Sequence, residues 1–175
     1  MIRRGALAAL MLAAASGHTP AQADVVSADD RGFVIERRVT VNASPKATWA
    51  RLVKPGLWWS SKHSWSGQAA NMTLDPRAGG CFCERWKGGE AEHGRVLQAV
   101  PGKLLRLSAP LGPMQSMAVS AILTFDLVPV GAATEVRLRY IVGGNFGMDP
   151  RALAPAVDGV LREQLAGLVK VADFK

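Results

Sequence analysis

A series of strand patterns followed by one long amphipathic helix is the feature that most restricts the fold of this chain. The strand patterns are short runs rich in Val, Ile, Leu and Thr, each bounded by Gly, Pro, Asn or Asp. They predict strands over residues 32–41, 71–75, 81–87, 91–100, 104–108, 117–128 and 134–142. In the last run apolar and charged side chains alternate, which indicates a sheet with one buried and one solvated face.

Helical patterns lie between the first two strands and at the C-terminus. An N-cap serine and a first-turn proline predict a short helix over residues 45–53, and the aromatic residues 57–65 suggest a second short helix and a loop. A similar pair at residues 149–150 starts a long helix that reaches about Ala172. Pro155 either kinks this helix or marks its true start. Its apolar stripe consists of Leu153, Val157, Val160, Leu161, Leu165 and Leu168.

This order of elements predicts an α+β fold, with helices laid on one face of a curved antiparallel sheet. A length of 175 residues allows one domain, which we assign to residues 32–175. The polar residues 24–31 are expected to form a flexible N-terminal tail.

Residues 1–23 have the layout of a secretory signal peptide. A basic start precedes the apolar run GALAALMLAAA, which is too short to span a bilayer, and a small polar segment ends in Ala21-Gln22-Ala23. We therefore expect cleavage after Ala23 and a periplasmic or secreted protein. The alternative, an amphipathic first helix, agrees poorly with a run that has no polar face.

Charge and motifs exclude several classes of partner. The formal net charge is +7, but the longest basic cluster is Arg37-Arg38, so we expect no nucleic-acid partner. Beyond the N-terminus no apolar stretch is long enough to predict a membrane span. No G-x-S-x-G, H-E-x-x-H, P-loop or G-x-G-x-x-G motif is present, and we expect no cofactor. The sequence leaves the oligomeric state undefined.

The layout resembles the START/birch-pollen-allergen-like superfamily, called SRPBCC. The resemblance covers about residues 33–172 and is carried by the opening RRVTVNASPKATWARLV, the LWW and SW groups, Gly79-Gly80 and the stretch HGRVLQAVPGKLLRLS. It is nearest the branch of polyketide cyclases and homologues of the activator of the heat-shock chaperone ATPase. The signal peptide argues against chaperone activation itself.

The resemblance implies a helix-grip fold. In this fold a curved antiparallel sheet of about six to seven strands wraps the long C-terminal helix, two short helices follow the first strand, and a hydrophobic cavity lies between sheet and helix. The superfamily includes lipid and hormone carriers, aromatase/cyclases and modules without an assigned activity. The resemblance therefore implies a fold more than a function.

A glycine pair, Gly88-Gly89, predicts a two-residue hairpin turn of the primed type, which sets the register of the two strands. The face expected to point into the grip carries Phe82, Glu84 and Trp86 opposite Arg95, His93 and Ala91. The outer face carries the opposite-charge pairs Lys87/Glu90 and Arg85/Glu92.

Glu84 and His93 are the candidate catalytic residues. A carboxylate bonded to an imidazole in a partly dry site shifts both pKa values and can act as acid and base. The alternative is that the pair lies at a solvated rim and only fixes the register. The catalytic hypothesis predicts that Glu84→Gln weakens binding or turnover and barely moves the melting temperature.

Cys81 and Cys83 place two thiols on one face of a strand. We expect two reduced, packed thiols, although a strained disulfide is possible in an oxidising compartment. We expect no metal, because the predicted register puts His93 on the other face and a closed zinc site requires four ligands.

Aromatic and sulfur-containing side chains are the candidates for binding a ligand. Tryptophans in the segment after the first helix can line or gate a pocket, or they can cap the core. The candidate ligand-binding residues are Trp58, Trp59, Trp65, Phe82, Trp86, Arg95, Met117, Tyr140 and Phe146.

These residues favour an exported binding protein for a small apolar or aromatic molecule. One alternative is a cyclase- or hydratase-type enzyme that uses Glu84 and His93 as acid and base. The other is a non-catalytic interaction module with a filled core.

Overall fold

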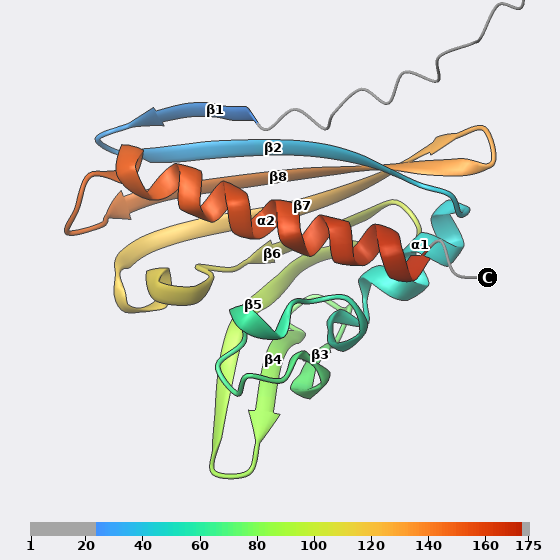
Figure 1. Ribbon diagram of the computed structural model, residues 1–175, viewed down its shortest axis with the longest axis horizontal. Coiled ribbons are helices and arrows are strands. Elements are labelled where there is room, and N and C mark those ends of the chain that lie inside the picture. Colours follow the sequence, from blue (N-terminus) through green and yellow to red (C-terminus); the bar gives the residue numbers. More distant parts are fainter. Residues whose placement is uncertain (1–23, 173–175) are drawn as a thin grey trace, which may run out of the picture.

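The computed structural model describes residues 24–172, so the expected signal peptide lies outside the described residues (Figure 1). One antiparallel sheet has the strand order β1-β2-β8-β7-β6-β5-β4-β3. Its strands are β1 (Asp24–Asp29), β2 (Gly32–Val41), β3 (Met72–Leu74), β4 (Cys81–Trp86), β5 (Gly89–Val100), β6 (Leu104–Ser108), β7 (Ala118–Val130) and β8 (Ala133–Asn145).

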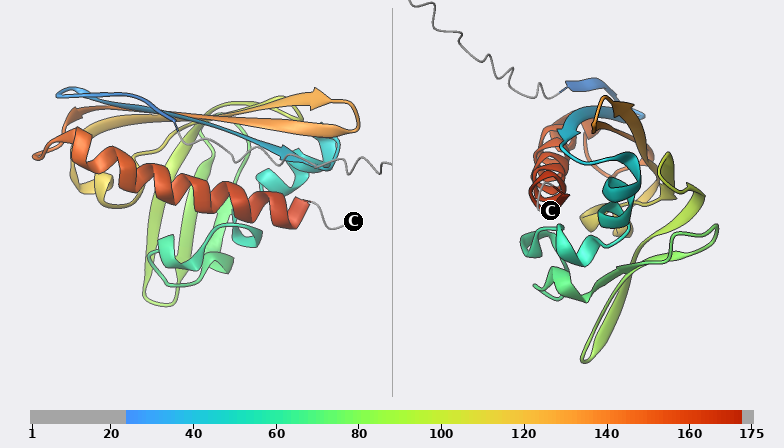
Figure 2. Two further views of the ribbon diagram at one scale, coloured as in Figure 1. Left: turned by 45° about the horizontal axis from the view of Figure 1, so that its top comes forward. Right: turned by 90° about the vertical axis from the view of Figure 1, so that its right-hand side faces the viewer.

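Within residues 24–172, two α-helices and four short 3-10 helices accompany the sheet. They are α1 (Pro45–Leu52), η1 (Pro55–Leu57), η2 (Ser61–His63), η3 (Ala69–Asn71), η4 (Gly112–Ser116) and α2 (Pro150–Ala172). Figure 2 shows α2 lying along the sheet, which curves around it, with η1–η3 beside the β4–β5 hairpin. This arrangement confirms the helix-grip prediction.

The sheet has one strand more than expected, because part of the expected N-terminal tail is ordered. Residues 24–29 pair with β2, with Val25 opposite Ile35 and Asp29 opposite Gly32. A tight turn makes this pairing possible, since the Asp29 carboxylate accepts a hydrogen bond from the Arg31 backbone N–H at 2.9 Å. Val25 also packs against the core, which favours a strand over a solvated tail.

The core lies between the concave face of the sheet and α2. On β8 the alternation works as predicted, and its buried residues are Thr134, Val136, Leu138, Tyr140 and Val142. From α2, Leu161, Leu165 and Leu168 are fully buried against them. Burying each such leucine stabilises the fold by about 1.5–3 kcal/mol.

The long helix begins at Pro150, so Pro155 lies inside it and does not mark its start. Asp149 caps the first turn, where its carboxylate accepts the Arg151 N–H at 2.9 Å. Further along, a Cβ at Gly167 would lie 2.2 Å from the Trp58 carbonyl oxygen. Glycine at this position therefore lets α2 pack directly on the backbone that follows η1.

A buried ion pair joins α2 to the sheet. Arg37 on β2 and Asp158 on α2 are 4% and 8% exposed, and the guanidinium binds the carboxylate through two hydrogen bonds, one of which (Nε to Oδ1) measures 2.6 Å. This ion pair was not predictable from the sequence, because Arg37 stands beside the exposed Arg38 in a basic pair. A two-pronged contact of this kind fixes the position of the helix on the sheet.

Removing one partner of this pair leaves a buried charge unpaired. We expect Arg37→Met or Asp158→Leu alone to lower the free energy of unfolding by about 3–5 kcal/mol, and the double variant to recover most of that loss. Urea unfolding measures both. The control is Arg38→Ala on the solvated face, where we expect a change within about 0.5 kcal/mol. Single variants no less stable than this control would contradict the assignment.

Candidate functional site

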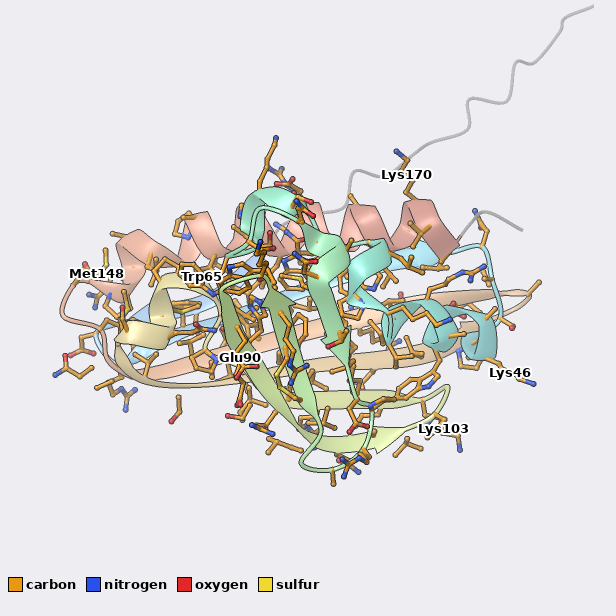
Figure 3. All side chains as sticks on the ribbon, turned by 90° about the horizontal axis from the view of Figure 1, so that it is seen from below. Lys46, Trp65, Glu90, Lys103, Met148 and Lys170 are labelled. Atoms are coloured by element: carbon orange, nitrogen blue, oxygen red, sulfur yellow. A yellow bond between two sulfur atoms is a disulfide. The ribbon has the colours of Figure 1, made fainter. Side chains whose placement is uncertain are left out.

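A pocket of about 240 Å³ lies between α2, the segment around η2 and the segment that begins η4. From α2 it is lined by Leu153, Val157, Val160 and Leu161, and from the η4 segment by Leu111, Gly112, Pro113 and Met114. The η2 segment adds Trp59 and Trp65, of which Trp65 is labelled in Figure 3. His93 is the residue that the sheet contributes.

The β4–β5 hairpin turns one residue earlier than predicted. Trp86 pairs with Gly89, so the turn residues are Lys87 and Gly88. Of these two turn residues, Gly88 has the positive φ, of 95°, that the turn requires. At Gly89 a Cβ would lie 2.6 Å from the Trp86 ring. Glycine is therefore needed there so that the ring can pack on the backbone, and not for the turn itself.

The earlier turn changes the pairs on the outer face of the hairpin. Arg85 lies opposite Glu90 and forms an exposed ion pair with it at 3.2 Å. Glu92 lies opposite Cys83, and its ion pair is with Arg95. The predicted Lys87/Glu90 and Arg85/Glu92 pairs are therefore wrong.

A β-bulge at His93 determines which side chains of β5 reach the interior. Cys83 pairs with Glu92 and Phe82 pairs with Gly94, which leaves His93 as the extra residue. His93 and Gly94 are both buried. The bulge sends Arg95 to the outer face, with its side chain half exposed, so its expected place on the inner face opposite Phe82 is wrong.

Glu84 and His93 both face the interior and touch. His93 Nε2 lies 2.9 Å from Glu84 Oε2, a diagonal contact, because Glu84 is directly opposite Ala91. Both residues are buried, which excludes a pair at a solvated rim. The Glu84 carboxylate also accepts the backbone N–H groups of Trp65 at 3.0 Å and Ser66 at 2.7 Å.

These hydrogen bonds set the charge of Glu84. Burial raises the pKa of its carboxyl, but the hydrogen bonds from Ser66, Trp65 and His93 outweigh burial and hold the pKa below its usual range. Glu84 is therefore an ionised acceptor at neutral pH. It accepts the Nε2–H of His93, so Nε2 is the donor nitrogen of this contact.

Of this pair, His93 and not Glu84 lines the pocket. The ring packs on Phe82 with centroids 5.0 Å apart, which fixes its plane. Among the residues that the structure describes, Glu84 is the hydrogen-bond partner of this ring. With Nε2 held by Glu84, Nδ1 is the ring nitrogen left for a contact with a ligand.

Tyr140 holds a wall of the pocket in place but does not line it. Its hydroxyl donates to the Ala109 carbonyl at 2.7 Å and accepts the Leu111 N–H at 3.1 Å. The residue is fully buried, and burial raises the pKa of its phenol. With both partners on the 109–111 backbone, its role is to position the segment that supplies Leu111 and Met114.

Two of the nine expected ligand-binding residues line the pocket, Trp59 and Trp65. Trp59 is buried and its Nε1–H donates to the His63 carbonyl at 2.9 Å, whereas Trp65 is 51% exposed at the rim. Trp86 covers Gly89 at the tip of the hairpin. Trp58, Phe82, Tyr140 and Phe146 are buried in the core, Met117 packs against it partly buried, and Arg95 lies on the outer face of the hairpin.

Sequence reasoning missed the rim residues Lys62 and His63, which line the pocket. His63 Nε2 lies 3.0 Å from a carboxylate oxygen of Glu163 on α2. Hydrogen bonds from Ser60 and His63 hold the pKa of Glu163 below its usual range. The wall from α2 was detectable, because its four residues belong to the predicted apolar stripe.

Cys81 and Cys83 are joined as a disulfide, so the expectation of two reduced thiols is wrong. Their Cα atoms are 5.4 Å apart, inside the range that a disulfide spans. The bond lies on the outer face of the hairpin, beside Glu92 and away from the pocket.

The hydrogen bonds of Glu84 revise the expected effect of Glu84→Gln. An amide cannot accept all three donors, so we expect a loss of about 1–3 kcal/mol in unfolding free energy at pH 7. Because the folded pKa of Glu84 is lowered, its stabilisation is present above the usual carboxyl range and is lost as pH falls through the folded pKa.

Urea unfolding of the original protein and of the Glu84→Gln variant, at pH 7 and near pH 3, tests this pH dependence. The difference between them should shrink at the lower pH, below the usual carboxyl pKa of about 4. An equal difference at both values, or none at pH 7, would contradict the assigned role.

Among the described residues, no helix has the length and apolar character needed to cross a membrane.

Comparison with solved structures identifies the same fold in other proteins. Similar structures include CV1439 from Chromobacterium violaceum, with 17% identity, a TM-score of 0.58 and coverage of 81% of this chain and 98% of that one. CalU16 from Micromonospora echinospora has 16% identity, a TM-score of 0.58 and coverage of 86% and 82%. The Aha1 dimer from Colwellia psychrerythraea has 19% identity, a TM-score of 0.52 and coverage of 81% and 96%.

At these identities the structural likeness establishes the fold alone. No curated protein matches the sequence. Residues 33–173 match the family described as polyketide cyclase / dehydrase and lipid transport, which is most of the chain. The chain therefore belongs to this family, which confirms the resemblance to the SRPBCC superfamily.

Proposed function

We propose that this chain is an exported binding protein that holds one small hydrophobic or aromatic molecule in the pocket beside α2. The observation that carries the proposal is the composition of the pocket, an apolar wall from α2 and the η4 segment with the single imidazole of His93 on the sheet side. Burial of apolar ligand surface supplies affinity at about 25 cal/mol per Å². The imidazole then supplies orientation through one hydrogen bond.

The size of the pocket limits the ligand. A dry cavity of about 150 Å³ takes up benzene, so the volume of about 240 Å³ suits a molecule of one or two rings. A lipid with two full acyl chains is too large for it. The same volume does not agree with an interaction module whose core is completely filled.

Two features support export. Residues 1–23 have the three-part layout of a signal peptide with cleavage after Ala23. The Cys81–Cys83 disulfide is a bond that persists in oxidising compartments and is rare where glutathione keeps thiols reduced.

Native mass spectrometry of the freshly purified protein tests location and binding together. We expect a chain that begins at Asp24, lacks the two thiol hydrogens of Cys81 and Cys83, and carries one small apolar molecule. A chain that retains Met1 would reject export. A chain that stays empty after incubation with an excess of 2-naphthol would reject the pocket as a binding site.

Filling the pocket gives the matched test of its position. Val157→Phe places a ring inside the pocket, and Ala166→Phe places the same ring on the exposed face of the same helix. We expect the first to weaken 2-naphthol binding at least tenfold, or about 1.4 kcal/mol, and the second to leave it unchanged, by calorimetry. Equal affinities in the two variants would place the ligand elsewhere.

A second candidate function is a cyclase- or hydratase-type enzyme in the same pocket. It is favoured by the contact between His93 Nε2 and ionised Glu84, which orients the ring with Nδ1 as a general base. The lowered pKa of Glu84 makes this carboxylate a positioning partner and not a proton donor.

His93→Gln separates the two functions. For a carrier we expect 2-naphthol binding within about threefold of the original, since apolar burial dominates affinity. For an enzyme we expect conversion of the co-purified molecule to fall by about 10²–10⁴ while binding persists. Undiminished conversion in His93→Gln would reject the catalytic role of this pair.

A further inference from the structure

The outer face of the β4–β5 hairpin gathers three metal-binding side chains away from the pocket. Cys81 and Cys83 lie side by side on β4, and Glu92 lies opposite Cys83 on β5. The two cysteine sulfurs and one carboxylate oxygen of Glu92 all lie within 4.8 Å of one another. The side chain of His93, next along β5, points to the opposite face, where it is buried.

We infer that this face is a redox-gated metal site that binds one thiophilic ion, such as Zn²⁺, when the disulfide is reduced. Thiolates select soft or borderline ions such as Zn²⁺ and Cu⁺ over Mg²⁺ and Ca²⁺. Two thiolates and a carboxylate give three protein ligands and leave one position for water or another ligand, as in open zinc sites.

The spacing of the backbone suits such a site. With Zn–S bonds of about 2.3 Å, two sulfurs on a tetrahedral ion lie about 3.8 Å apart. Once the bond between them is broken, side-chain rotation can separate the sulfurs this far while the Cα atoms stay near 5.4 Å. The ladder pair of Cys83 and Glu92 fixes the third ligand without any movement of the strands.

The disulfide controls metal binding, because only free thiolates bind the ion and sulfurs joined to each other are not thiolates. A dithiol reductant donates two electrons and two protons to the Cys81–Cys83 bond, which becomes two thiols while the reductant becomes a disulfide. Zn²⁺ then displaces the two thiol protons to solvent as it binds. Cys81 is the accessible end for this reaction, since it is partly exposed and Cys83 is buried.

Arg95 sets the balance between the closed and the metal-bound state. It lies opposite Cys81 and holds the Glu92 carboxylate in an ion pair, and it also donates to the Gly79 carbonyl at 3.3 Å. This pair keeps the carboxylate beside the sulfurs while the disulfide is closed. To bind a metal, Glu92 has to exchange the guanidinium for the ion, so Arg95 competes with it.

Competition for Zn²⁺ against a chromophoric chelator tests the site on the whole chain. The protein is reduced with a dithiol, freed of the reductant without oxygen and compared with the oxidised form. We expect one Zn²⁺ per reduced chain, at least about 100-fold weaker binding to the oxidised chain, and about tenfold weaker binding to reduced Glu92→Gln. With Co²⁺, the reduced chain should show sulfur-to-metal charge-transfer absorption.

Matched variants make the result specific to these residues. Glu90→Gln removes the next carboxylate on the same face, labelled in Figure 3, and should leave affinity unchanged. Arg95→Gln should tighten binding, because it removes the competitor for Glu92. Equal binding by the oxidised and reduced chains, or equal loss in Glu90→Gln and Glu92→Gln, would overturn the proposal. None of these outcomes depends on the pocket or on its ligand.

Discussion

The backbone N–H groups of Trp65 and Ser66 are held by a carboxylate that the sheet buries, and the pocket depends on this contact. The segment between η2 and η3 has no strand on which to pair. An ionised acceptor with two oxygens satisfies both donors at once, and charge-assisted bonds of this kind are about twice as strong as neutral ones. Glu84 therefore acts as the anchor of a loop as well as the partner of His93.

The other walls of the pocket are held by the same kind of contact, a buried polar side chain hydrogen-bonded to loop backbone. Tyr140 binds the backbone of the 109–111 segment, and the Gln164 amide oxygen accepts the Ser60 N–H at 2.7 Å. In each case a buried polar side chain of β8 or α2 satisfies backbone groups of a loop. The arrangement has a cost at Gln164, whose amide nitrogen is buried without a hydrogen-bond partner in the described structure. Loops held in this way keep an unfilled space between them, which apolar packing alone would tend to close.

The helix wall depends on a different contact. The residues of α2 that line the pocket lie on either side of Asp158, which binds Arg37 of β2. Leucine packing is tolerant of small shifts along a helix axis, whereas a two-pronged ion pair is not. The pair thus determines which apolar residues of α2 face the pocket. It also explains why a charged residue interrupts the predicted apolar side of the helix.

The fold was predictable because it rests on periodicity. The alternation over residues 134–142 and the stripe from Leu153 to Leu168 each identify a buried face without knowledge of the partner. The site was only partly predictable, since it depends on long-range polar contacts. Nothing in the sequence near Arg37 indicates Asp158, and nothing near Tyr140 indicates the backbone of Leu111. Burial with satisfied hydrogen bonds makes such residues part of the core, where sequence patterns expect only apolar side chains.

The hairpin shows how a correct contact can follow from a wrong register. Counting from a Gly88-Gly89 turn puts Glu84 opposite His93, but the turn lies one residue earlier, which shifts the pairing by two and keeps each side chain on its face. Near the turn the inward residues are therefore the predicted ones. The bulge then changes the phase of β5, so the prediction fails from Gly94 onward.

That bulge also makes room for the opposite wall of the pocket. It turns two consecutive residues, His93 and Gly94, toward the interior. A Cβ at Gly94 would lie 2.7 Å from the Cβ of Ala109, so only glycine lets the segment after β6 pass so close to β5. One inserted residue thus brings an imidazole to the pocket and, through its neighbour, admits the backbone that Tyr140 holds over it. Deleting His93 would restore regular pairing with Gly94 still opposite Phe82 and Arg95 still opposite Cys81, so it would remove the imidazole from the pocket and keep the close approach at Gly94.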